Sequence, residues 1–269
     1  MPAIDTIASY QGTSGSSYAA GTMAGGDSNV VRNAPLTSRV HLLQAMYDSV
    51  TANEPWRVRS PALVDNVQGI RFWPGETPQQ RLLPRQVRQL LQPQDTLTFE
   101  FSTAAATGKA LGALGIYYEQ LPGISARLAS HGDIAGNVAY IKPLVITFGL
   151  GANTAGAWYD LVATTTENLL EANTDFAVLG YTVDTGVAAV AIKGVETGNL
   201  RVGGPGIVQG DETTEYFVML SQDTGLPCIP VINSANIGNV YGSIISSAAT
   251  AAAVDLVFYL AQLAHNLPA

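Results

Sequence analysis

A glycine-rich segment is the first place where this sequence could support chemistry. Residues 149–156 follow an apolar stretch and have the glycine spacing of a phosphate-binding loop, but Ala157 and Trp158 stand where such a loop needs Lys followed by Ser or Thr. A second glycine–lysine pair at Lys109 lacks the upstream glycine, because Thr103 occupies that position. We therefore expect a turn at 149–156 and not a nucleotide site.

Histidines and acids form no recognisable catalytic or metal-binding pattern. His41, His131 and His265 are far apart in the sequence, and none belongs to a zinc-binding spacing. The adjacent acids Asp211 and Glu212 follow a glycine and are typical of a solvated turn, with a cation site as the alternative. With 21 acids in the chain, a pair that comes together in the fold could still act as general acid and base. The sequence gives no positive support for an enzyme, a cofactor or a metal.

The sole cysteine, Cys228, excludes an intrachain disulfide framework. It lies in an apolar stretch between two prolines, where we expect a buried, unreactive thiol. The N-terminus lacks the basic and apolar run of a secretory signal, so we expect an unprocessed chain made in a cytoplasm. The apolar stretch 248–264 is interrupted by Asp255, and we expect a core strand there and not a membrane helix.

Charge is the unusual feature of the composition. Only 13% of the 269 residues are charged, and the lysines are Lys109, Lys142 and Lys193 alone. An average soluble domain is about 25% charged. Because interface cores are depleted in Lys and Glu, the composition favours a chain that hides much of its surface against partners. A monomer solvated by Ser, Thr, Asn and Gln is the alternative.

The charges divide the chain into three zones, which we interpret as domains. Residues 1–31 are rich in Gly and Ser, carry two acids and no base, and predict a flexible N-terminal arm. Residues 32–92 carry eight arginines and four acids, and predict an Arg/Pro-rich linker with short helices. Residues 93–269 carry fifteen acids and five bases, and predict a β-sandwich body.

The linker arginines alternate with aromatic residues, which indicates extended chain lying on a surface. Guanidinium pairs with carboxylates and stacks on aromatic rings in buried interfaces, so we expect these residues to contact the acidic body or a neighbouring subunit. A nucleic-acid-binding strip is the alternative, weakened by the small excess of positive charge. The predicted assembly contacts are Arg57, Arg59, Arg71, Arg81, Arg85, Arg88, Trp56 and Trp73.

The hydrophobic periodicity predicts two short helices and many short strands. Apolar residues at i, i+3 and i+4 predict a helix over 38–47, and a second helix is expected within 79–91, broken at Pro84. A single helical turn is expected at 167–171. The predicted strands are 95–101, 111–119, 140–148, 158–164, 176–183, 187–192, 215–220, 229–232, 241–245 and 253–260.

An N-terminal arm, an Arg/Pro-rich linker and a lysine-poor β-sandwich together resemble jelly-roll viral capsid proteins, of the type found in bacteriophages and other non-enveloped viruses. The resemblance is architectural and rests on no diagnostic motif. It implies a mainly β, jelly-roll-like fold and a subunit of a closed shell, located in the virion. It also implies copies of the chain as partners, with other virion proteins possible and nucleic acid not a specific ligand. The alternatives are another assembly subunit, such as a decoration, tail, tube or sheath protein, and a carbohydrate- or ligand-binding β-sandwich.

Overall fold

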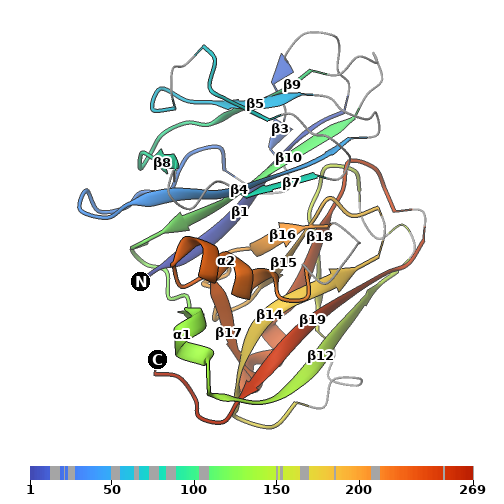
Figure 1. The fold of residues 1–269 in the computed structure, drawn as a ribbon. Helices are drawn as coiled ribbons and strands as arrows, with labels where there is room; N and C mark the ends of the chain where they lie inside the picture. Colours follow the sequence, from blue (N-terminus) through green and yellow to red (C-terminus); the bar gives the residue numbers. More distant parts are fainter. Residues whose placement is uncertain are drawn as a thin grey trace.

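The protein is described by a computed structural model that is mainly β. The described residues are 1–12, 19–20, 22–23, 28–49, 55–63, 67–72, 79–82, 89–102, 109–149, 151, 154–163, 170–184, 186–206, 213–250 and 252–268. Their strands form four antiparallel sheets, which pair into two sandwiches stacked on one another (Figure 1).

The first sandwich is built from residues 3–118. Its larger sheet has the order β3-β1-β10-β4-β7, with β8 also pairing with β4. These strands are β1 (Ala3–Gln11), β3 (Thr22–Met23), β4 (Val40–Ser49), β7 (Gln79–Leu82), β8 (Gln89–Leu91) and β10 (Ala110–Tyr118). The smaller sheet has the order β2-β9-β5-β6. Its strands are β2 (Ala19–Ala20), β5 (Trp56–Arg59), β6 (Ile70–Phe72) and β9 (Thr98–Phe101).

An aromatic stack fills the first sandwich. Trp56 is 1% exposed, and its ring lies 4.4 Å from that of Phe72 and about parallel to those of Phe99 and Phe101. Gly112 on β10 faces the same indole, and a Cβ there would lie 2.7 Å from the Trp56 ring. Glycine at this position lets the large sheet approach the stack.

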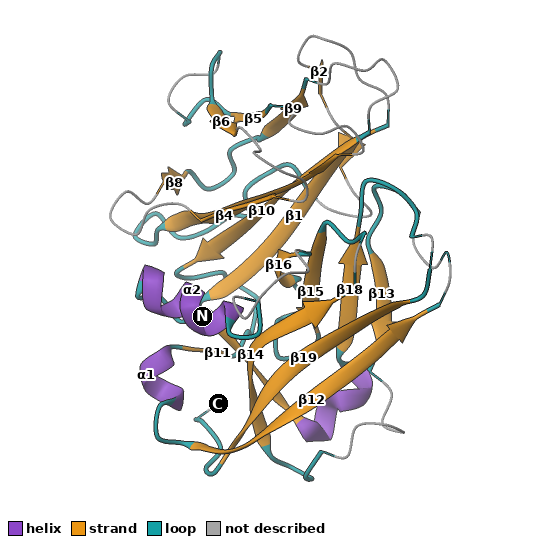
Figure 2. Cartoon of the chain, turned by 45° about the vertical axis from the view of Figure 1, so that its right-hand side comes forward, coloured by secondary structure: helices purple, strands orange, loops and turns teal. Residues whose placement is uncertain are grey.

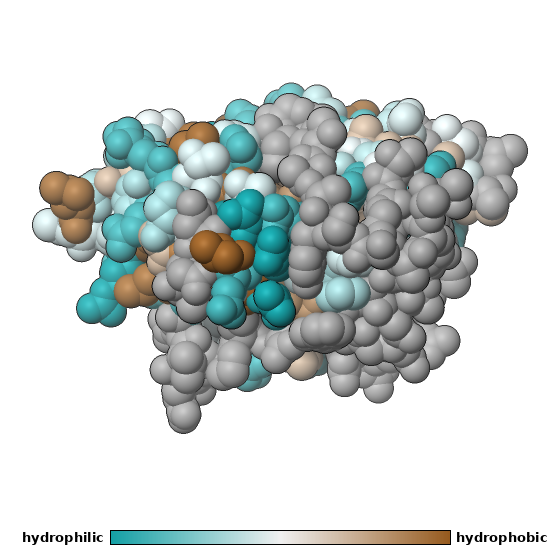
Figure 3. All heavy atoms as spheres, turned by 90° about the horizontal axis from the view of Figure 1, so that it is seen from above, coloured by the Kyte–Doolittle hydropathy of each residue, from teal (hydrophilic) through white to brown (hydrophobic). Residues whose placement is uncertain are grey.

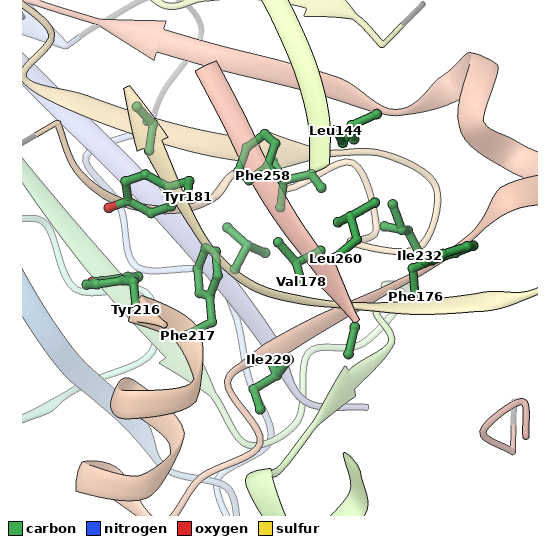
Figure 4. Close-up of a cluster of buried hydrophobic side chains, with 14 of the residues drawn as sticks. Leu144, Phe176, Val178, Tyr181, Tyr216, Phe217, Ile229, Ile232, Phe258 and Leu260 are labelled. Carbon is green, nitrogen blue, oxygen red and sulfur yellow. The ribbon is translucent and has the colours of Figure 1, made fainter. Parts of the chain in front are cut away.

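The second sandwich is built from residues 128–263. One sheet has the order β11-β17-β14-β19-β12 and the other β13-β18-β15-β16. The first of these contains β11 (Leu128–Ala129), β12 (Val138–Phe148), β14 (Asp175–Val183), β17 (Ile229–Asn233) and β19 (Val254–Leu263). The second contains β13 (Tyr159–Val162), β15 (Ala189–Lys193), β16 (Val202–Pro205) and β18 (Tyr241–Ile245). Phe176, Val178 and Tyr181 of β14 and Phe258 and Leu260 of β19 fill its core (Figure 4).

Helical segments are short and belong to the second sandwich (Figure 2). They are α1 (His131–Ile134), α2 (Tyr216–Thr224) and the 3-10 segment η1 (Ser234–Asn239). Tyr216 and Phe217 of α2 are buried against Tyr181. The helix ends at Gly225, whose φ of 67° is the left-handed conformation that commonly closes a helix. In the described part of the chain, no helix is long and apolar enough to cross a membrane.

The two sandwiches meet through the outer face of the β1-β10-β4 sheet and the outer face of the β15-β16-β18 sheet. Ala8, Met46 and Ala113 from the first sandwich form one buried cluster with Ala191 and Ile245 from the second. The molecule therefore has four layers of sheet in series, with the smaller sheet of the first sandwich at one end and the β14-β19-β12 sheet at the other (Figure 1).

The flexible-arm prediction for residues 1–31 is wrong over Ala3–Gln11. This segment is β1, hydrogen-bonded between β10 and β3, with eight of its nine residues buried. The composition misled because buried polar residues have specific partners: Arg32 Nε donates to Asp5 at 2.7 Å, and Thr6 Oγ1 accepts from the Gly203 amide at 3.0 Å. Residues 13–18, 21 and 24–27 of the predicted arm lie outside the described residues.

The predicted helix at 38–47 is wrong, because Val40–Ser49 is strand β4. Leu42 and Leu43 are both buried, on opposite faces of the strand, and so are Ala45 and Met46. A strand buried on both faces loses the alternation that identifies strands and acquires spacings that imitate a helix. The predicted helix within 79–91 is wrong at its ends, which are β7 and β8; residues 83–88 lie outside the described residues.

Two smaller predictions are also corrected, and strand β16 was not predicted. Residues 215–220, predicted as a strand, lie mostly in helix α2. Residues Val202–Pro205 form β16, in which Gly203 is needed because a Cβ there would lie 2.4 Å from the Val190 carbonyl. The boundary at 92/93 falls inside the first sandwich, which β9 and β10 complete. The helical turn predicted at 167–171 lies mainly outside the described residues.

The remaining predicted strands are confirmed, with ends shifted by a few residues. The mainly β class and the sandwich architecture are confirmed as well.

Candidate assembly surfaces

Arg57 and Arg59 lie on the outer face of the β2-β9-β5-β6 sheet and share one carboxylate. Trp56 and Val58 point into the core, so the alternation of the strand sends both arginines outward. Arg57 Nε donates to Glu100 Oε2 at 2.5 Å, and Arg59 Nη2 donates to Oε1 at 2.7 Å. The hydrogen bond from Arg59, opposed by burial and joined by that from Arg57, lowers the pKa of Glu100. The prediction that linker arginines face carboxylates is confirmed for this pair, although the partner is in the neighbouring strand.

The other predicted contact residues have separate outcomes. Arg71 is exposed on β6, opposite Arg57, on the same outer face. The prediction that Trp56 is an assembly contact is wrong, because its side chain is buried between the two sheets of the first sandwich. Arg81 lies on β7 without a described side chain. Arg85, Arg88 and Trp73 lie outside the described residues, and a role of the arginines in assembly stays a prediction.

A second charged cluster closes the end of the second sandwich, and the sequence analysis missed it. Arg127 binds both oxygens of Asp175, at 2.9 and 2.6 Å, and donates to the Leu267 carbonyl at 3.1 Å. Asp175 is 1% exposed and also accepts from Asn233 and from the Leu267 amide. Burial alone would raise the pKa of Asp175, but the hydrogen bonds from Arg127 and Asn233 outweigh it and lower the pKa. The cluster fastens the C-terminal segment to the sandwich.

A third cluster is centred on Asp160, beside the junction of the sandwiches. Lys193, Arg201 and Ser243 all donate to its carboxylate, at 2.9, 3.0 and 2.6 Å. Burial opposes ionisation of Asp160, yet these partners together lower its pKa. The Arg201 guanidinium also lies 5.1 Å from the centre of the Trp158 ring. In all three clusters the carboxylate is held ionised by cations of the same chain, which suits a structural role.

The remaining candidates from the sequence are scattered. His41 is 2% exposed and pairs with Glu119 at 3.1 Å, His131 begins α1, and His265 lies in the C-terminal segment. Cys228 is buried, as predicted. Within the described ranges, no group of three or more His, Cys, Asp or Glu side chains is placed to hold a metal ion. Asp211 and Glu212 lie outside them.

The outer face of β12 and β19 carries half-buried apolar residues at its centre, Val145, Val257 and Tyr259. Leu144, Ile146 and Phe148 point into the core, so the odd-numbered residues of β12 face outward. The outward pairs across the two strands are Pro143–Tyr259, Val145–Val257 and Thr147–Asp255. A solvated sheet face normally carries polar residues at such positions. At the start of the same edge strand, Tyr140 and Ile141 are 66% and 53% exposed.

The opposite end of the molecule has a different chemical character. Seen from the side of the β2-β9-β5-β6 sheet, the described surface is largely hydrophilic, and hydrophobic residues form separate patches (Figure 3). Arg57, Arg59, Arg71 and Glu100 give this face an excess of positive charge. The two ends of the four-layer stack are therefore chemically unlike one another.

Comparisons with known proteins give little further information. No protein-family model and no curated protein matches the sequence. Among solved structures, the major capsid protein P2 from bacteriophage PM2 matches with 10% identity over 99% of both chains, at a TM-score of 0.25. A chain of Sulfolobus Turreted Icosahedral Virus matches with 8% identity, over 100% of this chain and 82% of that one, at a TM-score of 0.24. At these TM-scores the likenesses carry no argument about function.

Proposed function

We propose that the chain is a structural, non-enzymatic subunit of a self-assembling shell, most simply a viral capsid protein located in the virion. Its principal partners are copies of itself, and nucleic acid is not a specific ligand. The observation that carries the proposal is the run of exposed apolar residues at the start of β12, Val138, Tyr140 and Ile141, beside a half-buried apolar sheet face, on a chain that is only 13% charged. Such a face on a lysine-poor protein is typical of a surface that is covered by a partner.

The strand order supports the same proposal. The larger sheets have corresponding orders, β1-β10-β4-β7 and β12-β19-β14-β17, and in each the last strand of the sandwich, β10 or β19, lies between an early strand and a middle one. The smaller sheets, β2-β9-β5-β6 and β13-β18-β15-β16, also correspond strand by strand in their order. We infer that each sandwich is a jelly roll and that the chain contains two in tandem. Jelly rolls occur in viral capsid proteins and also in lectin and cupin domains, so fold alone does not decide the function.

The position of the aromatic residues disfavours the carbohydrate-binding alternative. A sugar-binding sandwich would present aromatic rings and acids together in a groove on one sheet. Here Trp56, Phe72 and Phe99 are within the core of the first sandwich. A hollow beside the C-terminal segment is lined by Asp175, Glu196 and several asparagines, without an aromatic residue.

Negative-stain microscopy of the purified, concentrated chain tests the proposal. We expect shells, sheets or other regular arrays. Tubes or sheaths would favour the other assembly subunits considered above, and would replace the capsid assignment. Isolated particles of one chain, combined with specific retention on a glycan array, would contradict the proposal and support a ligand-binding sandwich.

A further inference from the structure

A hollow beside the C-terminal segment contains a buried carboxylate that is only partly satisfied. Glu196 is 5% exposed, and its Oε2 accepts no hydrogen bond from the described residues. The hollow that it lines has a volume of about 450 Å³, and we call it the Glu196 hollow. The other polar residues of its lining are Ser125, Arg127, Asp175, Asn233, Asn236 and Asn266.

Glu196 is anchored by its own turn, which connects β15 to β16. Its carbonyl accepts a hydrogen bond from the Arg127 amide at 2.6 Å. Thr197 is fully buried and braces the turn: its Oγ1 accepts from the Gly194 amide at 2.9 Å and donates to the Leu200 carbonyl at 2.8 Å. The backbone of Glu196 is therefore fixed. The terminal torsion of a glutamate is soft, so a small rotation presents its unpartnered oxygen to a donor in the hollow.

The charges around the hollow do not balance. Arg127 binds both oxygens of Asp175, and the two charges of this pair cancel. Glu196 Oε1 accepts only from neutral donors, the Asn236 side chain at 2.6 Å and the Asn233 amide at 3.4 Å. No cation of the described residues forms an ion pair with Glu196. A buried carboxylate without a cation is unfavourable, so the hollow favours uptake of a positively charged group.

An ammonium group suits this hollow better than a metal ion. Calcium takes about six to eight oxygen ligands, several of them from carboxylates. Within the described ranges no three His, Cys, Asp or Glu side chains converge on one point, and the Arg127 guanidinium repels a doubly charged ion more strongly than a singly charged one. An ammonium group carries a single charge and donates several hydrogen bonds, which matches one carboxylate among neutral amides.

The apolar parts of the lining fit a short aliphatic chain. Val195, which is 51% exposed, and Leu267 line the Glu196 hollow beside its polar residues. A smaller hollow of about 190 Å³ shares Arg127 and Leu267 with it, and its lining includes Leu128 and Val231. The carbon chain of an amine bound at Glu196 therefore has apolar surface to lie on.

We propose that the Glu196 hollow binds a primary ammonium group carried by a short aliphatic chain. A free aliphatic amine and a lysine side chain of another chain present this same group. The inference does not depend on the proposed structural function, because a single folded chain contains the whole hollow.

Calorimetric titration of the full chain with n-butylamine measures the binding. The titration is made at about pH 7, where an aliphatic amine is protonated. 1-Butanol is the matched uncharged ligand, and N-acetyl-lysine methylamide presents a lysine side chain without its backbone charges. We expect one n-butylamine bound per chain and no measurable binding of 1-butanol.

Glu196→Gln removes the charge and keeps an acceptor for Asn236. We expect it to lower the affinity for n-butylamine about tenfold or more, because a hydrogen bond to a charged group is replaced by one to a neutral group. Glu215→Gln is the matched control, because Glu215 is exposed, precedes α2 and does not line the hollow. This control should bind n-butylamine as the wild type does. Circular dichroism and thermal unfolding establish that each variant is folded.

If Glu196→Gln does not fold, Val195→Lys replaces it. Val195 is half-exposed and lines the hollow, so the new ammonium group should compete with n-butylamine and weaken its binding by a similar factor. Unchanged affinity in that variant would overturn the inference.

The remaining outcomes are equally decisive. Binding of N-acetyl-lysine methylamide as tightly as n-butylamine supports the site and makes a lysine side chain a sufficient ligand; binding of n-butylamine alone supports it with a free amine as the source. Absence of binding by either amine, equal binding of n-butylamine and 1-butanol, or equal affinities of folded Glu196→Gln and the wild type would overturn it. None of these results alters the assembly state, on which the proposed function is tested separately.

Discussion

Gln44 and Gly203, which are 159 residues apart in the chain, are joined by a buried hydrogen bond from Gln44 Nε2 to the Gly203 carbonyl, 2.9 Å long. Gln44 belongs to β4 of the first sandwich and Gly203 to β16 of the second. Side-chain donors are rarely buried between sheets unless an acceptor meets them, since an unpaired buried donor costs about 1–3 kcal/mol. This hydrogen bond therefore helps to fix the position of one sandwich relative to the other.

Gly203 should tolerate no side chain. A Cβ would lie 2.4 Å from the Val190 carbonyl and 3.2 Å from Thr6 Oγ1. We expect Gly203→Ala to lower the free energy of unfolding by about 1–3 kcal/mol, as overpacked sites do. Urea unfolding measures the loss. Gly149→Ala is the control, because a Cβ there meets nothing within 4 Å; equal stability of the two variants would show that β16 is not closely packed at Gly203.

Removal of β1 should unfold the first sandwich. A chain that starts after Gly12 loses the strand that pairs with β10 over nine residues, and with it the buried side chains of Ile4 and Ile7. We expect loss of cooperative thermal unfolding and aggregation, because β10 becomes an uncovered edge. Removal of Met1 and Pro2 alone is the control and should leave the melting curve nearly unchanged. A soluble, cooperatively folded chain without β1 would restore the flexible-arm interpretation.

The error at β1 shows where sequence reasoning fails for this fold. A strand with one buried face, such as the second half of β12, alternates between apolar and exposed residues, and its period of two identifies it in the sequence. β1 and β4 are buried on both faces between sheets, so their polar residues Asp5 and Gln44 look like surface residues or a helix face until their partners are known. Those partners lie 27 and 159 residues away in the sequence, and the periodicity of a local segment contains no information about them.

The candidate surfaces were predictable only in part. The alternation of Arg57 and Arg59 with apolar residues is visible in the sequence. A carboxylate partner was predicted for them, although Glu100 was not named. The apolar face of β12 and β19 was not predicted, because residues such as Val145 and Val257 read as core in any apolar strand. Which face of such a strand is covered depends on the stacking of the sandwiches.

Loss of Arg127 should be more damaging than loss of an exposed arginine. Arg127→Ala leaves Asp175, which is 1% exposed, without its cation. We expect a destabilisation of about 3 kcal/mol, as for other buried pairs that lose one partner. Arg39→Ala is the control; Arg39 is exposed, and a change within about 0.5 kcal/mol is expected. Similar chemical-denaturation midpoints for the two variants would contradict a role of Arg127 in fastening the C-terminal segment.

Acid should destabilise the fold through the same carboxylates. The pKa values of Asp175, Asp160 and Glu100 are lower in the folded protein than in the unfolded chain. Such groups stabilise above their unfolded pKa, about 3.9 for Asp, and lose that contribution as the pH falls through the folded value. Urea midpoints should be nearly constant from about pH 7 to about pH 5 and fall below about pH 4. Asp175→Asn should reduce the acid-dependent part, and an unchanged acid dependence in that variant would contradict the assignment.

Salt should have little effect on assembled particles. Arg57 and Arg59 are paired with a carboxylate that is 10% exposed, and such pairs are weakly screened. We expect constant particle yield between about 50 mM and about 500 mM salt, with little nucleic acid retained. Retention of nucleic acid at low salt with steep release as salt rises is the signature of phosphate contacts, and would assign these arginines to nucleic acid.

Sedimentation velocity of the purified chain across a wide range of concentrations tests the central claim most directly. A chain of 28.2 kDa built to be covered by its own copies should sediment as assemblies much larger than one subunit, in a proportion that rises with concentration. A single species of 28.2 kDa at every concentration would contradict the account.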